Sequence, residues 1–304
     1  MVKAATAARR RRLTAAAFLA PFLVLFVVAM VAPVGYTIWM SLFREQSNGG
    51  LGFGGAERVF VGLDNYVRAV SDRGFRSGFA NLAIYCVIYI PLMLGGALAL
   101  ALLLDTALVR ARRFFQLALF LPHAVPGLIA AIIWLYLYTP GLSPIVDLLA
   151  DGGLAWNFFD PDTVVISVVN MAAWQWTGYN VIIFYAALQA VPREVLEASA
   201  IDGAGSVTTA LRVKVPMIRS AVVLTTLFTV VGSIQLFTEP RVVQLKAQGM
   251  DSAWSPVLYI YRAAFTEHDY GLAAAASLLL AGLAGGLSYA VTKFGNRTRK
   301  GALA

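Results

Sequence analysis

The sequence predicts an all-α membrane protein with six transmembrane helices, and both its composition and its apolar segments favour this fold class. Of the 304 residues, 59% are hydrophobic and only 13% are charged, and the mean hydropathy is +0.73. Soluble globular chains carry about 25% charged residues. The charged residues are too few to shield this many apolar residues from water. The composition therefore excludes an ordinary soluble domain.

Six apolar segments supply the predicted spans, because a helix of about 20 residues crosses the hydrocarbon layer of a bilayer. They cover residues 14–42, 79–104, 114–139, 163–188, 221–237 and 272–294. The fifth is short, and it spans if residues 218–220 and Thr238 join the helix or if it lies at a thin or tilted place. On the side of the N-terminus fall 16 of the 24 Lys and Arg, but only four of the 16 acidic residues. Because Lys and Arg collect in cytoplasmic loops, we expect both termini in the cytoplasm.

The basic residues also suggest two other interpretations. Arg9–Arg12 precede an apolar run, as in a secretion signal or a twin-arginine signal. That run is far longer than the apolar part of a cleaved signal, about 7 to 15 residues, so we expect an uncleaved span in the cell membrane. The net charge of +8 does not indicate nucleic acid as a partner, because the basic residues lie at the ends of spans. The single cysteine, Cys86, permits no disulfide within the chain.

Three connections are predicted on the outer side. The first, residues 43–78, begins with a glycine-rich stretch and continues into a short helix on the membrane surface. The second, residues 140–162, has apolar residues at helical spacing, which predicts a short helix at the outer interface. The third, residues 239–270, carries Trp254, Tyr259 and Tyr261, whose rings favour the headgroup level.

Proline and glycine mark special places within the spans. Pro91, Pro122 and Pro126 each remove a backbone donor, so we expect the second and third spans to kink or open there. Gly282 and Gly286 form a GxxxG pair in the sixth span, which allows another helix to approach closely.

Several kinds of chemistry are missing from the chain. It has no GxxxxGK[ST] phosphate loop, so it does not bind ATP in that way and any motor must be another polypeptide. With two histidines, one cysteine and no HExxH, it has neither the ligands for a metal cluster nor a Cys/His nucleophile pair. We therefore expect no enzyme activity, no metal and no cofactor in this chain.

Polar uncharged and aromatic residues gather in the fourth span and at the end of the fifth. The six apolar cores contain no Asp, Glu, Lys or Arg, which disfavours proton-coupled carriers and ion channels. Amides exchange hydrogen bonds with hydroxyl groups and aromatic rings cover apolar sugar faces, so this set favours a neutral, hydroxyl-rich solute. Equally, Trp and Tyr can anchor at interfaces and amides can bind other helices. The substrate-path candidates are Asn170, Trp174, Trp176, Tyr179, Asn180 and Gln235, with Gln175, Ser233 and Phe237 beside them.

Helical spacing divides the candidates of the fourth span into two stripes. Asn170 and Trp174 lie on one stripe, and Trp176, Tyr179 and Asn180 lie on the other. Only one stripe can face a path squarely, and we expect the second, because it continues toward the polar segment that follows the span. His123, in the third span, is expected to be neutral and bonded to backbone freed by Pro126, because buried polar groups must find partners.

That polar segment, residues 191–216, predicts two short helices in the cytoplasm. Pro192 suits the first helical position, and Gly203 suits the left-handed conformation that ends a helix. Ser206 is then the expected N-cap of a second helix through Lys214, and Pro216 disrupts the helix before the fifth span.

Residues 191–216 also resemble the EAA motif of binding-protein-dependent ABC importers, in which EAA, a glycine and a later I-x-L-P stand at fixed offsets. In this chain the matching positions are Glu197, Ala198, Ser199, Asp202, Gly203, Ala204, Val213, Val215 and Pro216. Ser199 stands where an alanine is usual, and Val213 and Val215 replace Ile and Leu. LQAVP before the motif, and YIYRAAF and DYGLAAAAS after the fifth span, extend the similarity to carbohydrate-uptake permeases over residues 79–294.

The resemblance implies the type I permease fold of ABC importers. A permease core at 79–294 would follow a cytoplasmic basic N-terminus with the first span (1–42) and an outer loop (43–78), and would precede a cytoplasmic tail (295–304). The implied partners are a second, similar permease, two copies of a cytoplasmic ATPase that binds the ATP, an extracytoplasmic solute-binding protein and membrane lipid. The residues implied in ATPase coupling are Glu194, Glu197, Ala198, Ser199, Asp202, Gly203 and Pro216.

The implied mechanism is alternating access, in which closure of the ATPases moves the EAA helices and, through them, the spans. The solute would be a neutral mono-, di- or oligosaccharide. Within the same family, glycerol-3-phosphate or another polyol is the alternative solute. Two other classes, a secondary carrier or facilitator and a structural membrane scaffold, remain open, although neither needs the 191–216 segment.

Overall fold

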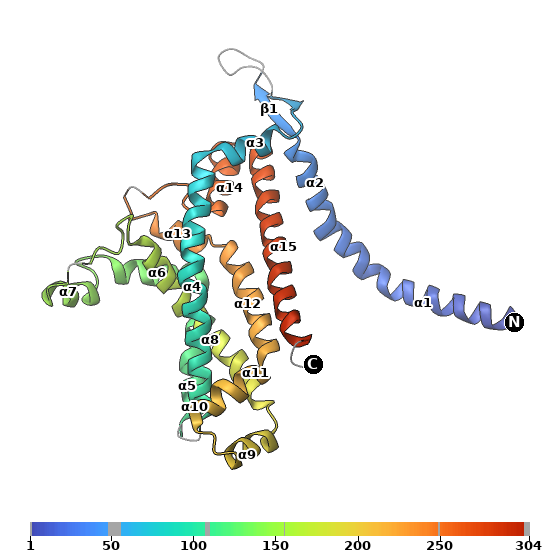
Figure 1. Ribbon diagram of the computed structural model, residues 1–304. Helices are drawn as coiled ribbons and strands as arrows, with labels where there is room; N and C mark the ends of the chain where they lie inside the picture. The colour runs from blue at the N-terminus through green and yellow to red at the C-terminus, as the bar shows by residue number, and fades with distance from the viewer. Residues whose placement is uncertain (1, 48–55, 107–109, 155, 249, 301–304) are drawn as a thin grey trace. The chain divides into compact units, whose positions relative to one another are not determined.

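Helices make up most of the chain (Figure 1). The computed structural model describes residues 2–47, 56–106, 110–154, 156–248 and 250–300, and their side chains except those of 2–12, 15, 46–47, 56 and 294–300. Contacts divide the chain into unit 1, residues 1–71 and 263–279, and unit 2, residues 72–262 and 280–304.

Unit 1 begins with one long helical segment. It consists of α1 (Val2–Phe26), a π-helical turn (Val27–Val31) and α2 (Ala32–Ser41). Within it, residues Ala16–Ser41 are long and apolar enough to cross a membrane, with a mean hydropathy of 2.6. The large apolar side chains along this stretch are exposed, which suits a surface that contacts lipid or another helix.

A β-hairpin follows where the sequence analysis predicted only a loop. Strand β1 (Phe43–Ser47) pairs with β2 (Ala56–Phe60) in an antiparallel register that places Phe43 opposite Phe60. Their rings meet edge to face at 5.4 Å, and Arg58 forms an ion pair with Glu45 across the strands at 3.2 Å. Such cross-strand pairs stabilise a hairpin, and they explain why an all-α prediction is incomplete here. The short helix predicted in this connection is present as α3 (Asp64–Ser71).

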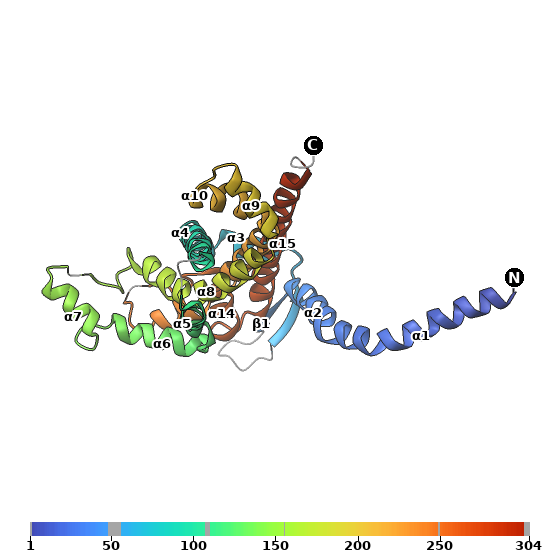
Figure 2. The same cartoon turned by 90° about the horizontal axis from the view of Figure 1, so that it is seen from below.

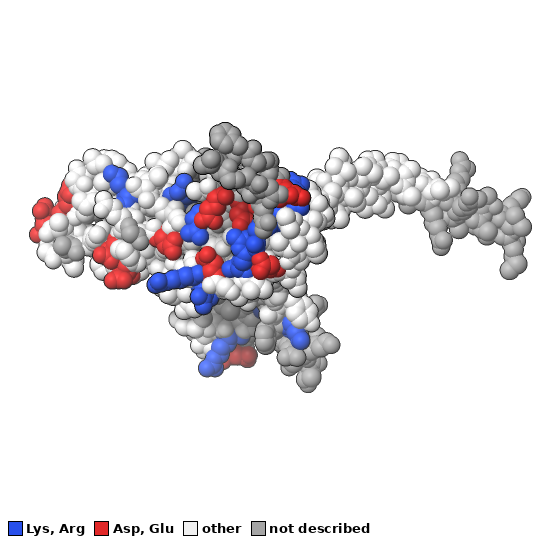
Figure 3. Space-filling model, turned by 90° about the horizontal axis from the view of Figure 1, so that it is seen from above, with Lys and Arg blue, Asp and Glu red and all other residues white. Residues whose placement is uncertain are grey.

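Polar contacts hold the pieces of unit 1 together. The buried side chain of Asn65 donates to the carbonyl oxygens of Ser41 and Phe43, both at 2.9 Å. Arg68 pairs with Asp269 at 2.8 Å, and Asp269 also accepts from the amide of Leu272 in the first turn of α15 (Tyr270–Lys300). Acidic and basic side chains are accordingly interspersed on the face drawn in Figure 3.

In unit 2, α8 (Val164–Gln189) lies between α4 (Arg73–Asp105) and α5 (Arg112–Ala124), as Figure 2 shows. Buried residues recur every three or four positions along α4, which is the spacing of one helical face. Tyr85 and Tyr89 stack on this face at 4.9 Å and pack with Met93 in the core. The helix runs without a break through Pro91, where we had expected a kink or an opening.

The predicted third span is broken. Its two halves, α5 and α6 (Gly127–Tyr138), meet at 95°. Val125 is extended and Pro126, which has no amide hydrogen, precedes α6, so the helix cannot continue there. After α6, the helix predicted at the outer interface is present as α7 (Pro144–Asp151), capped by the Ser143 hydroxyl.

The EAA segment and the last helices complete the chain. The former contains α9 (Arg193–Ile201), α10 (Ser206–Thr208), a π-helical turn (Thr209–Lys214) and α11 (Val215–Met217). Then follow α12 (Arg219–Ile234), α13 (Thr238–Val243), α14 (Pro256–Phe265) and α15 (Tyr270–Lys300). The third connection that the sequence predicts on the outer side thus contains helices that the sequence analysis did not predict.

Length and hydropathy alone identify fewer spans than the six predicted, so the six-span count stays a prediction. Among the described residues, four helical stretches are long and apolar enough to cross a membrane, and a fifth is added if the bent α5–α6 pair is one span. The four are Ala16–Ser41, Arg73–Asp105, Arg219–Val243 and Tyr270–Lys293. Helix α8 has 26 residues, but amides and aromatic rings in its middle lower its hydropathy. No described atom lies within 4 Å of a Cβ placed on Gly282 or Gly286, so the close helix approach expected there is not formed within this chain.

Candidate functional site

Helix α9 of the EAA segment ends in the way that the sequence predicts. Gly203 has a φ of +78°, which a residue with a Cβ adopts only at a cost. Its amide donates to Ala200 O, and the amide of Ala204 donates to Ser199 O, both at 3.0 Å. This pair of hydrogen bonds is a Schellman motif, which satisfies the last carbonyls of α9 and turns the chain sharply.

The second half of the segment departs from the prediction in its details. Pro192 precedes α9 instead of opening it, and Gly205, not Ser206, stands at the N-cap of α10. The helical run continues past Pro216 to Met217. Ile218 follows it, and the buried side chain of Ile218 belongs to the core between α4 and α8. The Ser199 hydroxyl donates to Leu196 O at 2.8 Å and lies 3.5 Å from the Thr209 hydroxyl, so Ser199 links the two short helices.

Asp105 fixes the EAA segment to the ends of two long helices. This carboxylate, at the last residue of α4, forms an ion pair with Lys214 and accepts from the Gln189 amide at the end of α8. Both side chains of the ion pair are largely buried, with 12% of Asp105 and 18% of Lys214 exposed. The sequence analysis assigned Asp105 no role, because no local pattern connects it to Lys214.

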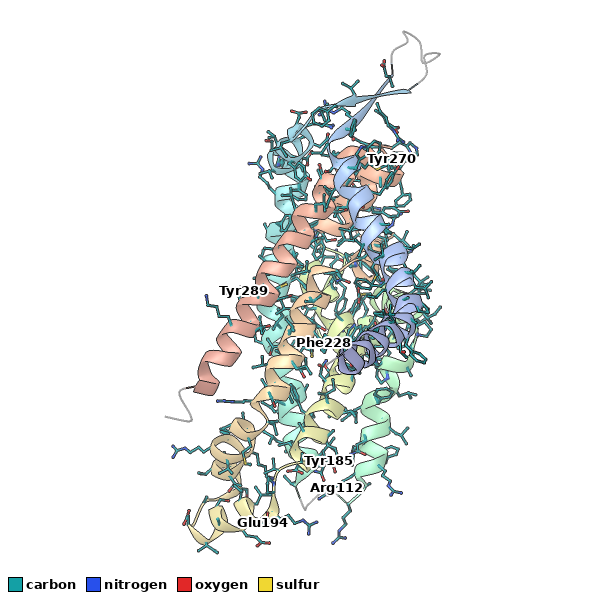
Figure 4. All side chains as sticks on the ribbon, turned by 90° about the vertical axis from the view of Figure 1, so that its right-hand side faces the viewer. Arg112, Tyr185, Glu194, Phe228, Tyr270 and Tyr289 are labelled. Atoms are coloured by element: carbon teal, nitrogen blue, oxygen red, sulfur yellow. The ribbon has the colours of Figure 1, made fainter. Side chains whose placement is uncertain are left out.

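The EAA segment also exposes apolar side chains. Ile201, Val207 and Leu211 are 86%, 71% and 59% exposed, which is unusual for aliphatic residues in a polar segment. Among the predicted coupling residues, Glu194, Glu197, Ala198, Asp202, Gly203 and Pro216 are exposed, and Ser199 is half-buried. Glu194 lies at the lower end of the molecule in Figure 4. Ile201 and Leu211 each precede a charged residue, Asp202 and Arg212, and an aliphatic residue beside a charge in a polar segment is the signal that could have identified this surface from the sequence.

A cavity of about 430 Å³ opens in unit 2 between α4, α8 and the α12–α13 region. This volume lies in the range of small-molecule sites, about 300–1,000 Å³. Phe228, labelled in Figure 4, is one of the residues that line the cavity. The polar and aromatic residues that line it are Tyr85, Tyr89, Gln175, Trp176, Tyr179, Asn180, Thr229, Ser233, Gln235, Phe237, Thr238 and Glu239.

The two predicted stripes of α8 lie in different surroundings. Trp176, Tyr179 and Asn180 line the cavity, as does Gln235 from the end of α12. Asn170 and Trp174 do not line it: Asn170 donates to the Tyr138 hydroxyl at 2.7 Å, and the Trp174 ring packs at 5.9 Å against an indole of α6. Asn170 and Trp174 therefore make contacts that are typical of helix packing.

The bend between α5 and α6 is satisfied by Gln175. Its side-chain amide donates to Val125 O at 3.1 Å, so Gln175 bonds a carbonyl left free by the break. His123 was expected to bond freed backbone, but its buried Nδ1 has no hydrogen-bond partner among the described residues. Its ring instead packs on Tyr179 at 4.7 Å and on Trp176 at 4.8 Å, so it supports the rings of the cavity wall from behind.

Glu239 is the lining residue that the sequence analysis missed. The predicted fifth span stopped at residue 237, so Glu239 was assigned to an outer loop. In the structure the apolar stretch runs from Arg219 to Val243, through α12, a break and α13. Glu239 therefore lies within a candidate span, where the sequence analysis expected no ionisable residue.

Residues 92–293 match the family described as "Binding-protein-dependent transport system inner membrane component". The chain belongs to this family. It is therefore a multi-pass inner-membrane permease of a binding-protein-dependent ABC importer, and the resemblance seen in the EAA motif is confirmed.

Relatives and solved structures agree with this assignment. The sn-glycerol-3-phosphate transport system permease protein UgpA of Shigella flexneri is 33% identical over 265 residues, which cover 86% of either chain. The protein of the same description from Salmonella typhimurium is 34% identical over 265 residues, with the same coverage. Permeases of this family are transport subunits and not enzymes.

A similar fold occurs in a bacterial ABC transporter involved in the import of the acidic polysaccharide alginate. Its chain has a TM-score of 0.80 and 18% identity, and the match covers 95% of this chain and 96% of that one. A bacterial alginate ABC transporter in complex with a periplasmic protein bound to an alginate pentasaccharide gives the same TM-score, identity and coverage. The likeness shows the fold of the permease.

Proposed function

We propose that this chain lines half of the path of an ATP-driven importer for a neutral sugar. The observation that carries the proposal is that one unit holds both a cavity walled by amides and aromatic rings and the EAA segment with its Gly203 turn. Amides and rings recognise hydroxyl groups and sugar faces, and the EAA segment offers a surface to a motor subunit.

The proposed topology has six spans with both termini in the cytoplasm. The bent α5–α6 pair and α8 would add two spans to the four long apolar stretches. The polar middle of α8 is compatible with a membrane, because its amides face the cavity and bond protein groups instead of lipid. A broken helix is compatible too, because Gln175 satisfies backbone at the break.

The proposed partners follow from the two ends of the path. Ile201, Val207 and Leu211 would seat in a cleft of a cytoplasmic ATPase, two copies of which bind and hydrolyse the ATP. A second, similar permease would complete the path, and an extracytoplasmic binding protein would deliver the solute. ATP-driven closure of the ATPases would then move the EAA segments and the spans that hold them.

Glycerol-3-phosphate is the second candidate solute. It is favoured by the function named for the relatives, which share a third of their residues with this chain over most of its length. Uptake by the reconstituted importer, with its own binding protein, separates the two solutes directly.

Matched substitutions on the two stripes of α8 test the assignment of the path. Losing one amide that bonds the solute costs about 1–2 kcal/mol, or roughly 5- to 30-fold in transport at limiting solute. We expect this loss for Asn180→Ala, and a similar one for Tyr179→Ala, in ATP-dependent uptake by proteoliposomes. Asn170→Ala and Trp174→Ala are the controls, because these residues lie outside the cavity.

Membrane levels of each variant are measured in the same experiment, so that loss of folding is separated from loss of transport. A defect confined to Asn170→Ala and Trp174→Ala would place the path on the opposite stripe. If none of the four variants affects uptake, the polar cluster serves helix packing and the assignment of the path is wrong.

A further inference from the structure

We infer that Glu239 determines the charge class of the solute: its carboxylate bonds sugar hydroxyls and rejects phosphate- or carboxylate-bearing solutes. The inference rests on the proposed function, because it takes the cavity as part of the path. It adds a binding residue that the EAA motif does not include and separates the two candidate solutes.

Glu239 lies at a break in a candidate span. Helix α12 ends at Ile234, α13 begins at Thr238, and every residue from Gln235 to Glu239 lines the cavity. Non-helical backbone at membrane depth is tolerated where it is buried in protein or lines a water-filled cavity. The freed carbonyl of Leu236 accepts from the buried Ser255 hydroxyl at 3.0 Å, so the break is satisfied within the protein.

The carboxylate has no counter-charge in the cavity. Among the described lining residues Glu239 alone has a carboxyl group, and none is Lys, Arg or His. Glu239 takes part in none of the ion pairs found in the described part of the chain. The nearest cation in the sequence, Arg241, is exposed, packs over the Tyr261 ring at 5.5 Å and donates to Gln244.

The neighbours of Glu239 suit a sugar. A carboxylate accepts hydrogen bonds at two oxygens, and the amides of Asn180 and Gln235 lie on the same cavity. The rings of Trp176 and Tyr179 offer apolar faces for a pyranose. An anionic solute finds no partner charge here and meets a like charge, which is strongly unfavourable in a partly desolvated site.

The charge of the cavity can be measured without knowing the solute. Gly232 lines the cavity, and no atom of the described residues lies within 4 Å of a Cβ placed on it, so Gly232→Cys in a Cys86→Ala background introduces a thiol with little disturbance. In the assembled complex, the rates of modification by a cationic and an anionic methanethiosulfonate reagent are compared. We expect the cationic reagent to react at least about tenfold faster, because the lining carries one negative and no positive charge.

Substitutions at Glu239 decide the origin of that preference. Glu239→Gln keeps the shape and removes the charge, so the ratio of the two rates should fall to near unity, whereas Glu239→Asp should retain it. Glu267→Gln, the same change at an exposed residue that does not line the cavity, is the control and should leave the ratio unchanged. An equal ratio in the parent and in Glu239→Gln would overturn the inference.

Solute uptake by the reconstituted importer is the second test of the inference. Proteoliposomes are supplied with ATP, the importer's own binding protein and, in turn, tritiated neutral mono- and disaccharides or glycerol 3-phosphate. We expect a neutral sugar to be imported, and Glu239→Gln to reduce that uptake at least roughly fivefold through the lost hydrogen bonds. Efficient import of glycerol 3-phosphate with Glu239 in place would overturn the inference while leaving the importer itself established. If the complex imports neither solute although the reagent ratio depends on Glu239, it is the proposed function that fails.

Discussion

Gly178 is the position at which helix packing in unit 2 is most sensitive to a single added methyl group. A Cβ at residue 178 would lie 1.7 Å from the carbonyl oxygen of Leu119, whereas contacts of a Cβ essentially never fall below 3.0 Å. The α5 backbone would therefore have to withdraw from α8 by about 1.3 Å. Because the obstacle is backbone, no change of rotamer relieves it.

The expected cost of Gly178→Ala lies at the upper end of the range for overpacking, about 3 kcal/mol. That is more than a hundredfold in the ratio of folded to unfolded protein. Withdrawal of α5 would also separate the His123 ring from Tyr179, so uptake should fall along with stability. Gly96→Ala is the matched control, because Gly96 is within a long helix and nothing in the described part of the chain lies within 4 Å of its added Cβ.

The assay is the temperature at which half of the purified complex loses its monodisperse peak in size-exclusion chromatography. We expect a clear decrease for Gly178→Ala and no decrease for Gly96→Ala. A midpoint for Gly178→Ala equal to those of the parent and of Gly96→Ala would refute the close approach of the two helices.

The remaining predictions concern the EAA segment and the topology. Gly203→Ala should cost about 1–2 kcal/mol, because its φ is positive, and should lower ATP-driven uptake, whereas Gly205→Ala, at a φ of −69°, should not. The solute affinity of the separate binding protein should be unchanged in both variants, and normal uptake by Gly203→Ala would count against a coupling role. In a Cys86→Ala background, an impermeant thiol reagent should label Asp151→Cys from outside intact cells and should leave Gly205→Cys unlabelled. Labelling at 205 from outside would invert the proposed orientation.

Features that depend on a few neighbouring residues were predictable from the sequence. The end of α9 at Gly203 is such a case, because a glycine at the C′ position acts through hydrogen bonds to the preceding turn. The break in the third span is another, because Pro126 lacks the amide hydrogen that a continuous helix needs. In both cases the determining atoms lie within one turn of the residue that signals them.

Features that depend on distant partners were not predictable in this way. The GxxxG pair predicted a close helix approach on α15, but α5 and α8 approach closely at Gly178, which belongs to no such motif. The need for glycine at 178 becomes evident only when the position of the α5 backbone is known. Glu239 was assigned to a loop because hydropathy falls before α13, although the helical stretch resumes after the break. The hairpin of β1 and β2 depends on pairing between strands, which a pattern in either strand alone does not specify.

Helix α4 touches both the cavity and the EAA segment. Tyr85 and Tyr89 line the cavity, and Asp105, at the end of the same uninterrupted helix, holds Lys214. With 33 residues the helix is roughly 50 Å long, and it contains no break that could absorb a displacement. In the proposed function, this uninterrupted helix contacts the solute near its middle and, at its end, holds the segment that meets the ATPase. We therefore expect substitutions along α4 that widen the solute preference to alter the ATP consumed per solute as well, because one continuous helix contacts both the cavity and the EAA segment.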